Sequence, residues 1–336
     1  MGVSLFFLSR LRGSEGEHLG ARAAQEQRRA PAQQHRAADA EQVLLDGLDL
    51  IELLVIEREP VAVLHDHLLA VNRQARDGAG GLALTEFAAG GIDRDELLGS
   101  VLPQKGVVAV INMAADYESL KKTVALCEKY DYIYGAVGIH PECANDLPDN
   151  WLSDVEALLS HPKIVAVGEI GLDYHWEDEC PREKQKEVLI AQLELAKKHD
   201  LPVVIHDREA HGDMMDILRK YKPKGVVHCF SGSAELAQET VKLGMYIGLG
   251  GVVTFKNARH SVDVAKAIPL DRLLTETDAP YMAPVPFRGK RCDSSMIPYD
   301  AAKIAEVRGI TAQEVLETAC ENACRLFGIT LPSAAK

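Results

Sequence analysis

The feature that most constrains the fold is a regular alternation of short apolar runs and longer amphipathic stretches from Lys105 onward. Runs rich in β-branched residues, such as Val107–Met113, are typical of buried strands, and amphipathic stretches such as Asp116–Lys129 have helical periodicity. Strands that alternate with helices form a parallel sheet. The seven predicted strands are Val107–Met113, Tyr132–Ile139, Ile164–Ile170, Pro202–His206, Gly225–Cys229, Met245–Leu249 and Leu273–Thr277.

Four of these strands deliver a potential metal ligand where the apolar run ends. The four residues are Glu169, His206, His228 and Asp278. A carboxylate directly after an apolar strand is costly when it is unpaired, because a lone charge in a low-dielectric interior is strongly unfavourable. Ligands at several strand ends are expected at the catalytic mouth of a (β/α)₈ barrel. We therefore predict an α/β fold, a TIM-like (β/α)₈ barrel of the metallo-hydrolase type.

A closed barrel needs an eighth strand before Val107, since open sheet edges would leave backbone donors and acceptors unpaired. Upstream, Val61–Leu64 is an apolar β-type run that ends in metal-binding residues. His65 and His67 flank Asp66 and lie on one face of an extended chain. This pattern predicts that residues 61–67 form the first barrel strand.

The first part of the chain differs in composition from the rest. Residues 1–58 are rich in Ala, Arg, Gln and Glu and contain few large apolar residues before Ala40–Glu57, which could form one amphipathic helix. We expect residues 1–58 to be an atypical extension, disordered or partly helical, that lies outside the barrel. The barrel would then span residues 59–330, which agrees with the roughly 250 residues of such a fold.

Bulk properties limit the class of protein. The formal net charge is −13, so non-specific binding to a polyanion is not expected from the surface as a whole. A phosphodiester substrate would need a positive field from bound metal and local arginines. The seven cysteines show no CxxC spacing, which predicts reduced thiols and a cytoplasmic location. No apolar run approaches the ~20 residues of a membrane span.

Five short motifs occur in order and together resemble the TatD-like metal-dependent hydrolases, a family of deoxyribonucleases. The resemblance covers about residues 92–330. Any one motif alone would be a weak signal, whereas five in the same order are specific. The motifs are GIHPE (Gly138–Glu142), GEIGLDY (Gly168–Tyr174), VVIHDREA (Val203–Ala210), HCFSGS (His228–Ser233) and ETDAPY (Glu276–Tyr281).

The resemblance implies an enzyme that cleaves phosphodiester bonds in DNA by metal-activated water, with two divalent ions. Glu169 matches the carboxylate that bridges both metals, and His206 and His228 match ligands of the second metal. Asp278 matches a ligand of the first metal that also handles the proton of the attacking water, so Glu169 and Asp278 are the predicted catalytic residues. Imidazole and carboxylate ligands suit Mg, Mn or Zn, and two metals about 3.5–4 Å apart can stabilise both the attacking and the leaving oxygen.

The sequence departs from the family at the first metal. The family carries a His-x-His pair at the end of its first strand, and these two histidines are ligands of the first metal. In this sequence the pair should fall near residues 81–86, which contain no histidine. One alternative is an insertion that makes His65 and His67 the true pair and ligands of the first metal. The other is that the native first strand is absent, which would leave that metal with Glu169 and Asp278.

Four further residues are candidates for binding the substrate: His140, Arg208, Arg288 and Arg291. His140 follows a strand and could contact a phosphate or cap a loop. Arg208 could bind a phosphate bidentately or pair with Glu209 or Asp173. Arg288 and Arg291 lie in the segment after Asp278. The alternative for both is a solvated surface charge without a role in binding.

DNA is the expected substrate and a monomer the expected state. The alternatives are a metallo-hydrolase that acts on a small amide, lactone or phosphoester, and a non-catalytic barrel with an incomplete first metal site. Basic and aromatic residues around the site indicate a nucleic acid, whereas a closed apolar pocket indicates a small molecule. Tyr281 and Phe287, next to Arg288 and Arg291, favour the nucleic acid.

Overall fold

The computed structural model describes residues 5–9 and 97–331, and these form a closed barrel of eight strands in sequential order. Seven neighbouring strands, β2 to β8, pair in parallel, and this confirms the predicted TIM-like barrel. The strands are β1 (Leu5–Ser9), β2 (Val107–Met113), β3 (Ile133–Val137), β4 (Ile164–Asp173), β5 (Val203–Arg208), β6 (Gly225–Val227), β7 (Tyr246–Leu249) and β8 (Leu273–Thr277).

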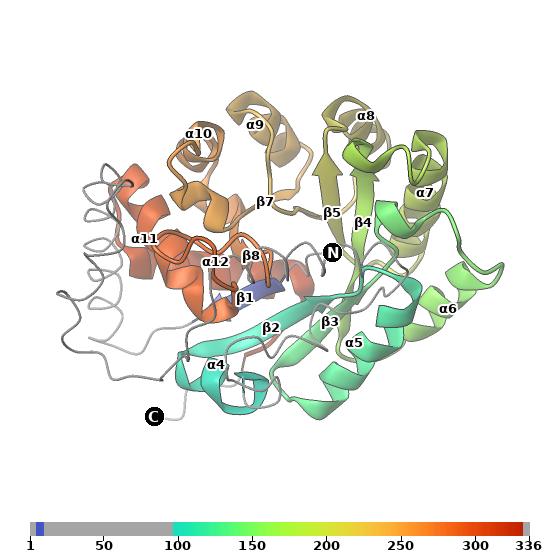
Figure 1. Cartoon of the computed structure of the whole chain (residues 1–336), viewed down its shortest axis with the longest axis horizontal. Helices are drawn as coiled ribbons and strands as arrows, with labels where there is room; N and C mark the ends of the chain where they lie inside the picture. The colour runs from blue at the N-terminus through green and yellow to red at the C-terminus, as the bar shows by residue number, and fades with distance from the viewer. Residues whose placement is uncertain (1–4, 10–96, 332–336) are drawn as a thin grey trace, which may run out of the picture.

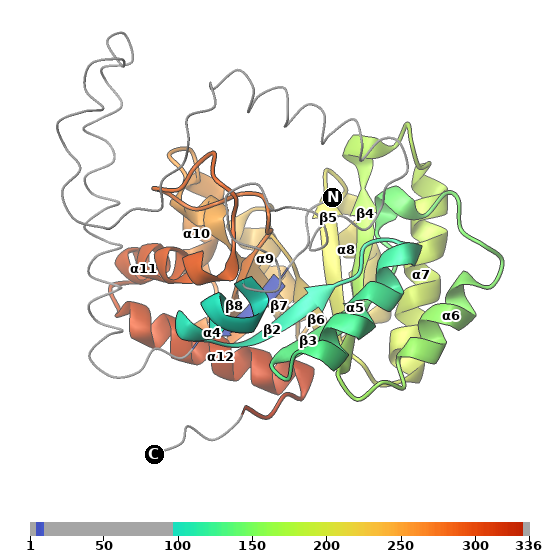
Figure 2. The ribbon, with the colours of Figure 1, turned by 60° about the horizontal axis from the view of Figure 1, so that its bottom comes forward.

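Helices follow the parallel strands and surround the barrel (Figures 1 and 2). A π-helical turn, Leu97–Val101, and the short α4 (Leu102–Gln104) precede β2. The longer helices are α5 (Tyr117–Lys129), α6 (Trp151–Leu158), α7 (Arg182–Lys198), α8 (His211–Tyr221), α9 (Ala234–Lys242), α10 (Arg259–Ala267), α11 (Ile297–Arg308) and α12 (Ala312–Phe327). Helix α5 begins and ends within one residue of the predicted stretch Asp116–Lys129, and Asp116 caps its N-terminus by accepting from the Ser119 backbone N–H.

Strand β4 is longer than predicted and reaches toward the end of the barrel at which the parallel strands have their C-termini. The apolar run suggested an end at Ile170, but the strand continues to Asp173. The extension is held by β5, because Leu172 pairs with Asp207 and Asp173 pairs with Arg208. All ten residues of β4 are buried, including Glu169 and Asp173. The strand therefore carries two carboxylates into the interior of the protein.

The strand that closes the barrel comes from an unexpected part of the chain. β1 (Leu5–Ser9) pairs antiparallel with both β2 and β8, and Phe6 faces Ile111 on one side and Glu276 on the other. The prediction that all of residues 1–58 lie outside the barrel is therefore wrong. LFFLS is a short apolar and aromatic run of the type that suits strands, and the edges of β2 and β8 require a partner whatever its direction. Residues 61–67, which we expected in this place, lie outside the described residues.

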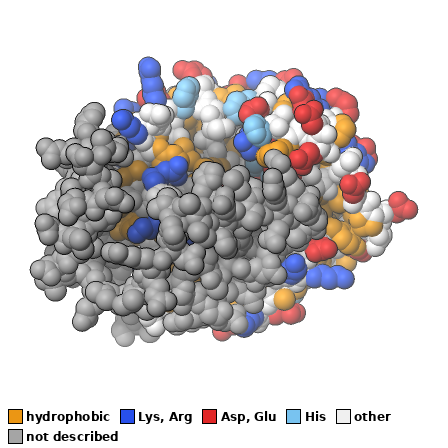
Figure 3. Space-filling view, in the orientation of Figure 1, with side chains coloured by type: hydrophobic (Ala, Val, Ile, Leu, Met, Phe, Trp, Pro, Cys, Tyr) orange, Lys and Arg blue, Asp and Glu red, His pale blue; other side chains and the backbone are white. Residues whose placement is uncertain are grey.

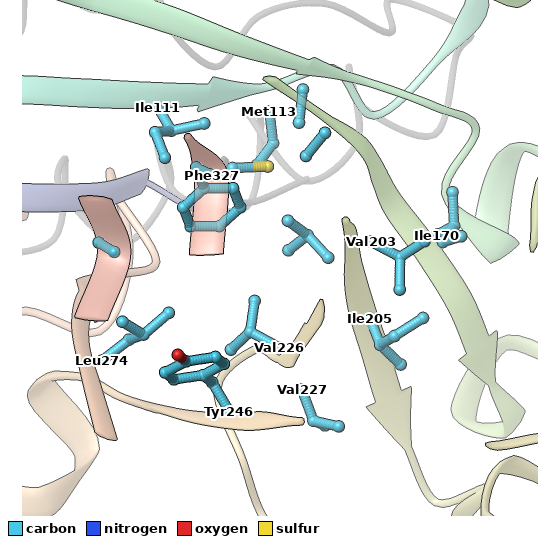
Figure 4. Packing of buried hydrophobic residues seen from close by; sticks show 14 of the residues in the cluster. Ile111, Met113, Ile170, Val203, Ile205, Val226, Val227, Tyr246, Leu274 and Phe327 are labelled. Atoms are coloured by element: carbon cyan, nitrogen blue, oxygen red, sulfur yellow. The ribbon is translucent and has the colours of Figure 1, made fainter. Parts of the chain in front are cut away.

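The core consists of strand side chains and the inner faces of the helices. Figure 4 shows Ile111, Ile170 and Ile205, from three strands, together with Phe327 from the end of α12. Ile111, Ile170 and Ile205 have no exposed surface, and Phe327 is 4% exposed. Such close packing makes the barrel a rigid frame, so residues at its strand ends hold fixed positions.

Two further expectations concern membrane-spanning helices and the state of the cysteines. None of their helices combines the length and the apolar character needed to cross a membrane. All seven cysteines lie in the described part of the chain and are thiols, with no disulfide among them. Both findings agree with the composition.

We predict that Phe6→Pro destabilises the barrel by on the order of 1–3 kcal/mol, the cost of leaving the partner of a backbone hydrogen bond unpaired. Because Phe6 pairs with strands on both sides, its backbone N–H faces one of them and proline removes that donor. Phe6→Val keeps the donor and is the control. Equal unfolding midpoints in urea for the two variants would mean that β1 does not support the barrel.

Candidate active site

Four strand ends bring Glu169, His206, His228 and Asp278 together at the C-terminal end of the barrel. Glu169 lies within β4 and His206 within β5, whereas His228 and Asp278 follow β6 and β8 directly. Glu169 Oε1 is 3.0 Å from His206 Nδ1 and 3.9 Å from His228 Nε2. Asp278 Oδ1 is 3.8 Å from the same His228 nitrogen. Their polar atoms converge on one small volume.

His140 joins this group from the loop after β3. Its Nε2 is 3.9 Å from Glu169 Oε1, and its ring centroid is 4.3 Å from that of His206. One carboxylate oxygen thus faces three imidazoles. His140, Glu169 and His206 each offer a ligand atom, and these atoms lie within 4.8 Å of one another. The group has the composition and spacing of a metal site.

Two buried carboxylates orient the histidines from behind. Asp173 Oδ2 is 2.9 Å from His206 Nε2, and Glu276 Oε2 is 2.9 Å from His228 Nδ1. The backbone N–H of Cys229 donates to Glu276 Oε1 over 2.5 Å. A carboxylate behind a histidine sets its tautomer and its ring orientation at metal sites. With Nδ1 held by Glu276, His228 presents Nε2 to Glu169 and Asp278.

These two orienting residues were not predicted from the sequence. Their signal is the two-residue period of a strand, which places side chains i and i+2 on one face. Asp173 lies four residues after Glu169, and Glu276 lies two residues before Asp278. A search for acidic residues in phase with each expected ligand would have found both.

A glycine makes room for the Glu276 carboxylate. A Cβ atom added at Gly248 in β7 would lie 2.4 Å from Glu276 Oε2 and 2.6 Å from its Cδ. Non-bonded carbon and oxygen atoms do not approach so closely, so the Glu276 carboxylate or the backbone at residue 248 would have to move. The absence of a side chain at Gly248 is therefore a condition for the contact between Glu276 and His228.

Burial and charge act in opposite directions on Glu169. Burial alone would raise its pKa, but the charge of His228 and the hydrogen bond from His206 outweigh it and hold the pKa well below its usual range. Burial also raises the pKa of Asp278, and there the neighbouring His228 only partly offsets it. The two carboxylates of the site consequently differ in their affinity for a proton.

The histidines show the complementary pattern. Burial disfavours their charged forms, yet the hydrogen bonds to Asp173 and Glu169 raise the pKa of His206 to about 10. The carboxylates Glu276 and Glu169 raise the pKa of His228 to about 9 against the same burial. His140 is different, because burial and the charge of His206 lower its pKa to about 3. Protons on His206 and His228 thus balance the buried carboxylates when no cation does.

The site opens into a cavity of about 580 Å³. Of the predicted substrate-binding residues, His140 and Arg208 line it. Arg288 does not, since its guanidinium stacks on the Phe255 ring at 3.7 Å from the centroid. Arg291 lines a separate small hollow with Asn112 and Pro280. His65 and His67, the expected ligands of a first metal, lie outside the described residues.

Known proteins resemble this chain over most of its described length. The family described as "TatD related DNase" matches residues 85–328. The metal-dependent hydrolase YabD of Bacillus subtilis is 43% identical over 240 residues, which cover 70% of this chain and 93% of YabD. The 3'-5' ssDNA/RNA exonuclease TatD of Cronobacter sakazakii is 32% identical over 246 residues, 70% of this chain and 92% of that protein. The crystal structure of YjjV, a TatD homolog from Escherichia coli, superposes with a TM-score of 0.66 at 35% identity and covers 70% of this chain and 92% of YjjV.

The pKa values predict how the metal-free protein responds to alkali. His206 and His228 have raised pKa values in the folded state, so the stability that they contribute is complete below their unfolded pKa of about 6.5. It is lost as pH rises through about 9 and about 10. With a chelator present, we expect the thermal unfolding midpoint to decrease as the pH is raised from 7 to about 10. His206→Gln should flatten this decline, and an identical pH profile would show that the imidazolium is not what stabilises the site.

Gly248→Ala should displace Glu276 from His228 and lower metal affinity roughly 10–100-fold, the usual effect of disturbing a residue that orients a ligand. Gly212→Ala in α8 is the matched control, since an added Cβ there meets nothing within 4 Å. Calorimetric titration with Mn²⁺ measures both. Equal affinities in the two variants would show that Glu276 does not position His228.

Proposed function

This chain belongs to the family of TatD related DNases and is a hydrolase, and on that premise we propose that it uses divalent metal ions to cleave phosphodiester bonds in DNA. The observation that carries the proposal is the single oxygen, Glu169 Oε1, that faces three imidazoles. A relative from Cronobacter sakazakii that bears the name of an ssDNA/RNA exonuclease supports a nucleic-acid substrate.

The residues at the mouth fit a divalent cation. Glu169 is 3% exposed, and a buried carboxylate requires a positive partner. In the absence of metal that charge comes from protons on His206 and His228, which a cation can replace. Imidazole and carboxylate donors together suit Mg, Mn or Zn. When bound, such ions supply Lewis acidity and positive charge at a phosphate.

Glu169 would hold both metals, with His206 and His228 as ligands of one and Asp278 as a ligand of the other. His65 and His67 remain the candidates for completing the first metal. Asp278 is also the candidate acceptor for the proton of the attacking water, because its carboxylate lies beside the candidate ligand His228 at the mouth of the barrel. If the first metal lacks further ligands, one complete site remains at Glu169, His206 and His228.

The walls of the cavity suggest how a phosphate is held. Arg208 is the one Lys or Arg among the described residues that line it, and its planar guanidinium can bind two phosphate oxygens. The Glu142 backbone N–H donates to His140 Nδ1, so the ring carries its proton on Nε2, toward Glu169. A neutral His140 can therefore donate one hydrogen bond next to the metals without adding charge.

Glu169→Gln tests the bridging assignment. The variant keeps the shape of the side chain but loses its charge, so we expect weaker binding of both metals and loss of hydrolysis of a single-stranded oligonucleotide by more than about 100-fold. Glu194→Gln, on the exposed face of α7, is the matched control. Calorimetry counts the metals bound, and a chelator should abolish the activity of the parent protein.

Two results would contradict this reading. Loss of only one metal in Glu169→Gln would exclude the bridge and favour a single-metal site. Full activity of the parent protein after removal of all metal would exclude the metal-dependent reaction itself.

A further inference from the structure

The mouth of the barrel is electrostatically divided. The segments 250–261 and 279–292, which follow β7 and β8, together contain five Lys or Arg residues and no Asp or Glu. The segments 138–150 and 174–181, which follow β3 and β4, contain six Asp or Glu residues and no Lys or Arg. Charges act over about 8 Å at physiological ionic strength, so this local contrast matters more to a bound polyanion than the net charge of −13.

The basic half of the mouth is one continuous rim. Arg288 stacks on Phe255 and thereby joins the segment after β8 to the segment after β7. The Val285 backbone N–H also donates to Thr254 Oγ1 over 2.8 Å. Lys256, Arg259 and Lys290 are exposed. Figure 3 shows Lys and Arg side chains at the upper left of this face, on the α10 side, and most of the visible carboxylates on the right-hand half.

The cavity that the candidate metal ligands line is also lined by residues of the segment after β7. Its lining there combines apolar side chains with a few polar groups, the composition typical of pockets for small organic groups. We call this part of the cavity the side lobe, and it is lined by Phe230, Val252, Val253, Asn257, Ala258 and His260. The opposite part, toward β3 and β4, is lined by acidic residues that include Glu142, Asp173 and Asp207.

We infer that the nucleic-acid strand runs over the β7–β8 side of the mouth, with one nucleoside in the side lobe and the adjoining phosphates bound by Lys256 and Arg259. The inference rests on the proposed function and specifies where its substrate lies. Apolar side chains combined with Asn257 and His260 suit a base and sugar, whereas the acidic segments after β3 and β4 repel phosphates. Arg259 pairs with Asp263 only at 4.0 Å, and both are largely exposed, so its charge remains available to a phosphate.

The path is tested by binding rather than by hydrolysis, so that its failure is distinct from failure of the proposed reaction. The probe is a fluorescein-labelled single-stranded oligothymidylate with phosphorothioate linkages, which slow hydrolysis so that the protein keeps its metal, and affinity is measured by anisotropy over a range of salt. For Lys256→Ala/Arg259→Ala, the slope of log affinity against log salt should decrease in magnitude by about 1.4, because each phosphate contact to a single strand contributes about 0.7.

The matched control is Lys242→Ala/Lys266→Ala. These exposed lysines lie in the last turns of α9 and α10, at the other end of the barrel, and their removal changes the net charge equally. The control should keep the parental slope. An unchanged slope in the Lys256/Arg259 variant, an equal change in the control, or no binding by the parent protein would each overturn the inference.

The side lobe is tested separately with His260→Ala. We expect affinity for the same oligonucleotide to fall about three- to tenfold with no change in the salt slope, since the lost contact is to the nucleoside rather than to a phosphate. His199→Ala, an exposed histidine at the C-terminal end of α7, is the control. Equal affinity of the His260 and His199 variants would remove the side lobe from the binding site.

Discussion

The structure depends on the burial of one charged group, the carboxylate of Glu169. It lies almost inaccessible inside β4, where an uncompensated charge would cost several kcal/mol. Imidazoles from β5 and from the segments after β3 and β6 meet this cost, and two of the three have a carboxylate behind them. Asp173 and Glu276 hold His206 and His228 in place. The candidate metal site is therefore an alternation of buried imidazoles and carboxylates.

Such an arrangement is possible because the barrel is rigid and its parallel strands all end on the same side. Close packing beneath the site fixes Glu169, His206 and His228 relative to one another. The glycine at position 248 shows how tight the fit is, because a single added methyl group would overlap Glu276. The segments around the rim, by contrast, differ in charge from one half of the mouth to the other.

Much of the fold was predictable from local patterns. The apolar runs, each followed by a helical stretch, predicted the bounds of β2 to β8 to within a few residues. This was possible because burial on both faces of a strand leaves a continuous apolar run in the sequence. The direction and origin of the closing strand were not predictable. β1 is a five-residue run that pairs antiparallel, and nothing local in LFFLS distinguishes it from other short apolar segments.

The sequence by itself determined which candidate residues reach the mouth: Glu169, His206, His228 and Asp278 lie at the ends of apolar runs, and a strand end directs its side chain to the mouth whatever its neighbours are. Only the tertiary structure decided which partners surround them. His140 beside His206, Glu276 behind His228 and Arg288 on Phe255 are contacts between segments far apart in the chain. Distances of this kind depend on how strands and loops pack across the barrel, which no local pattern of residues specifies.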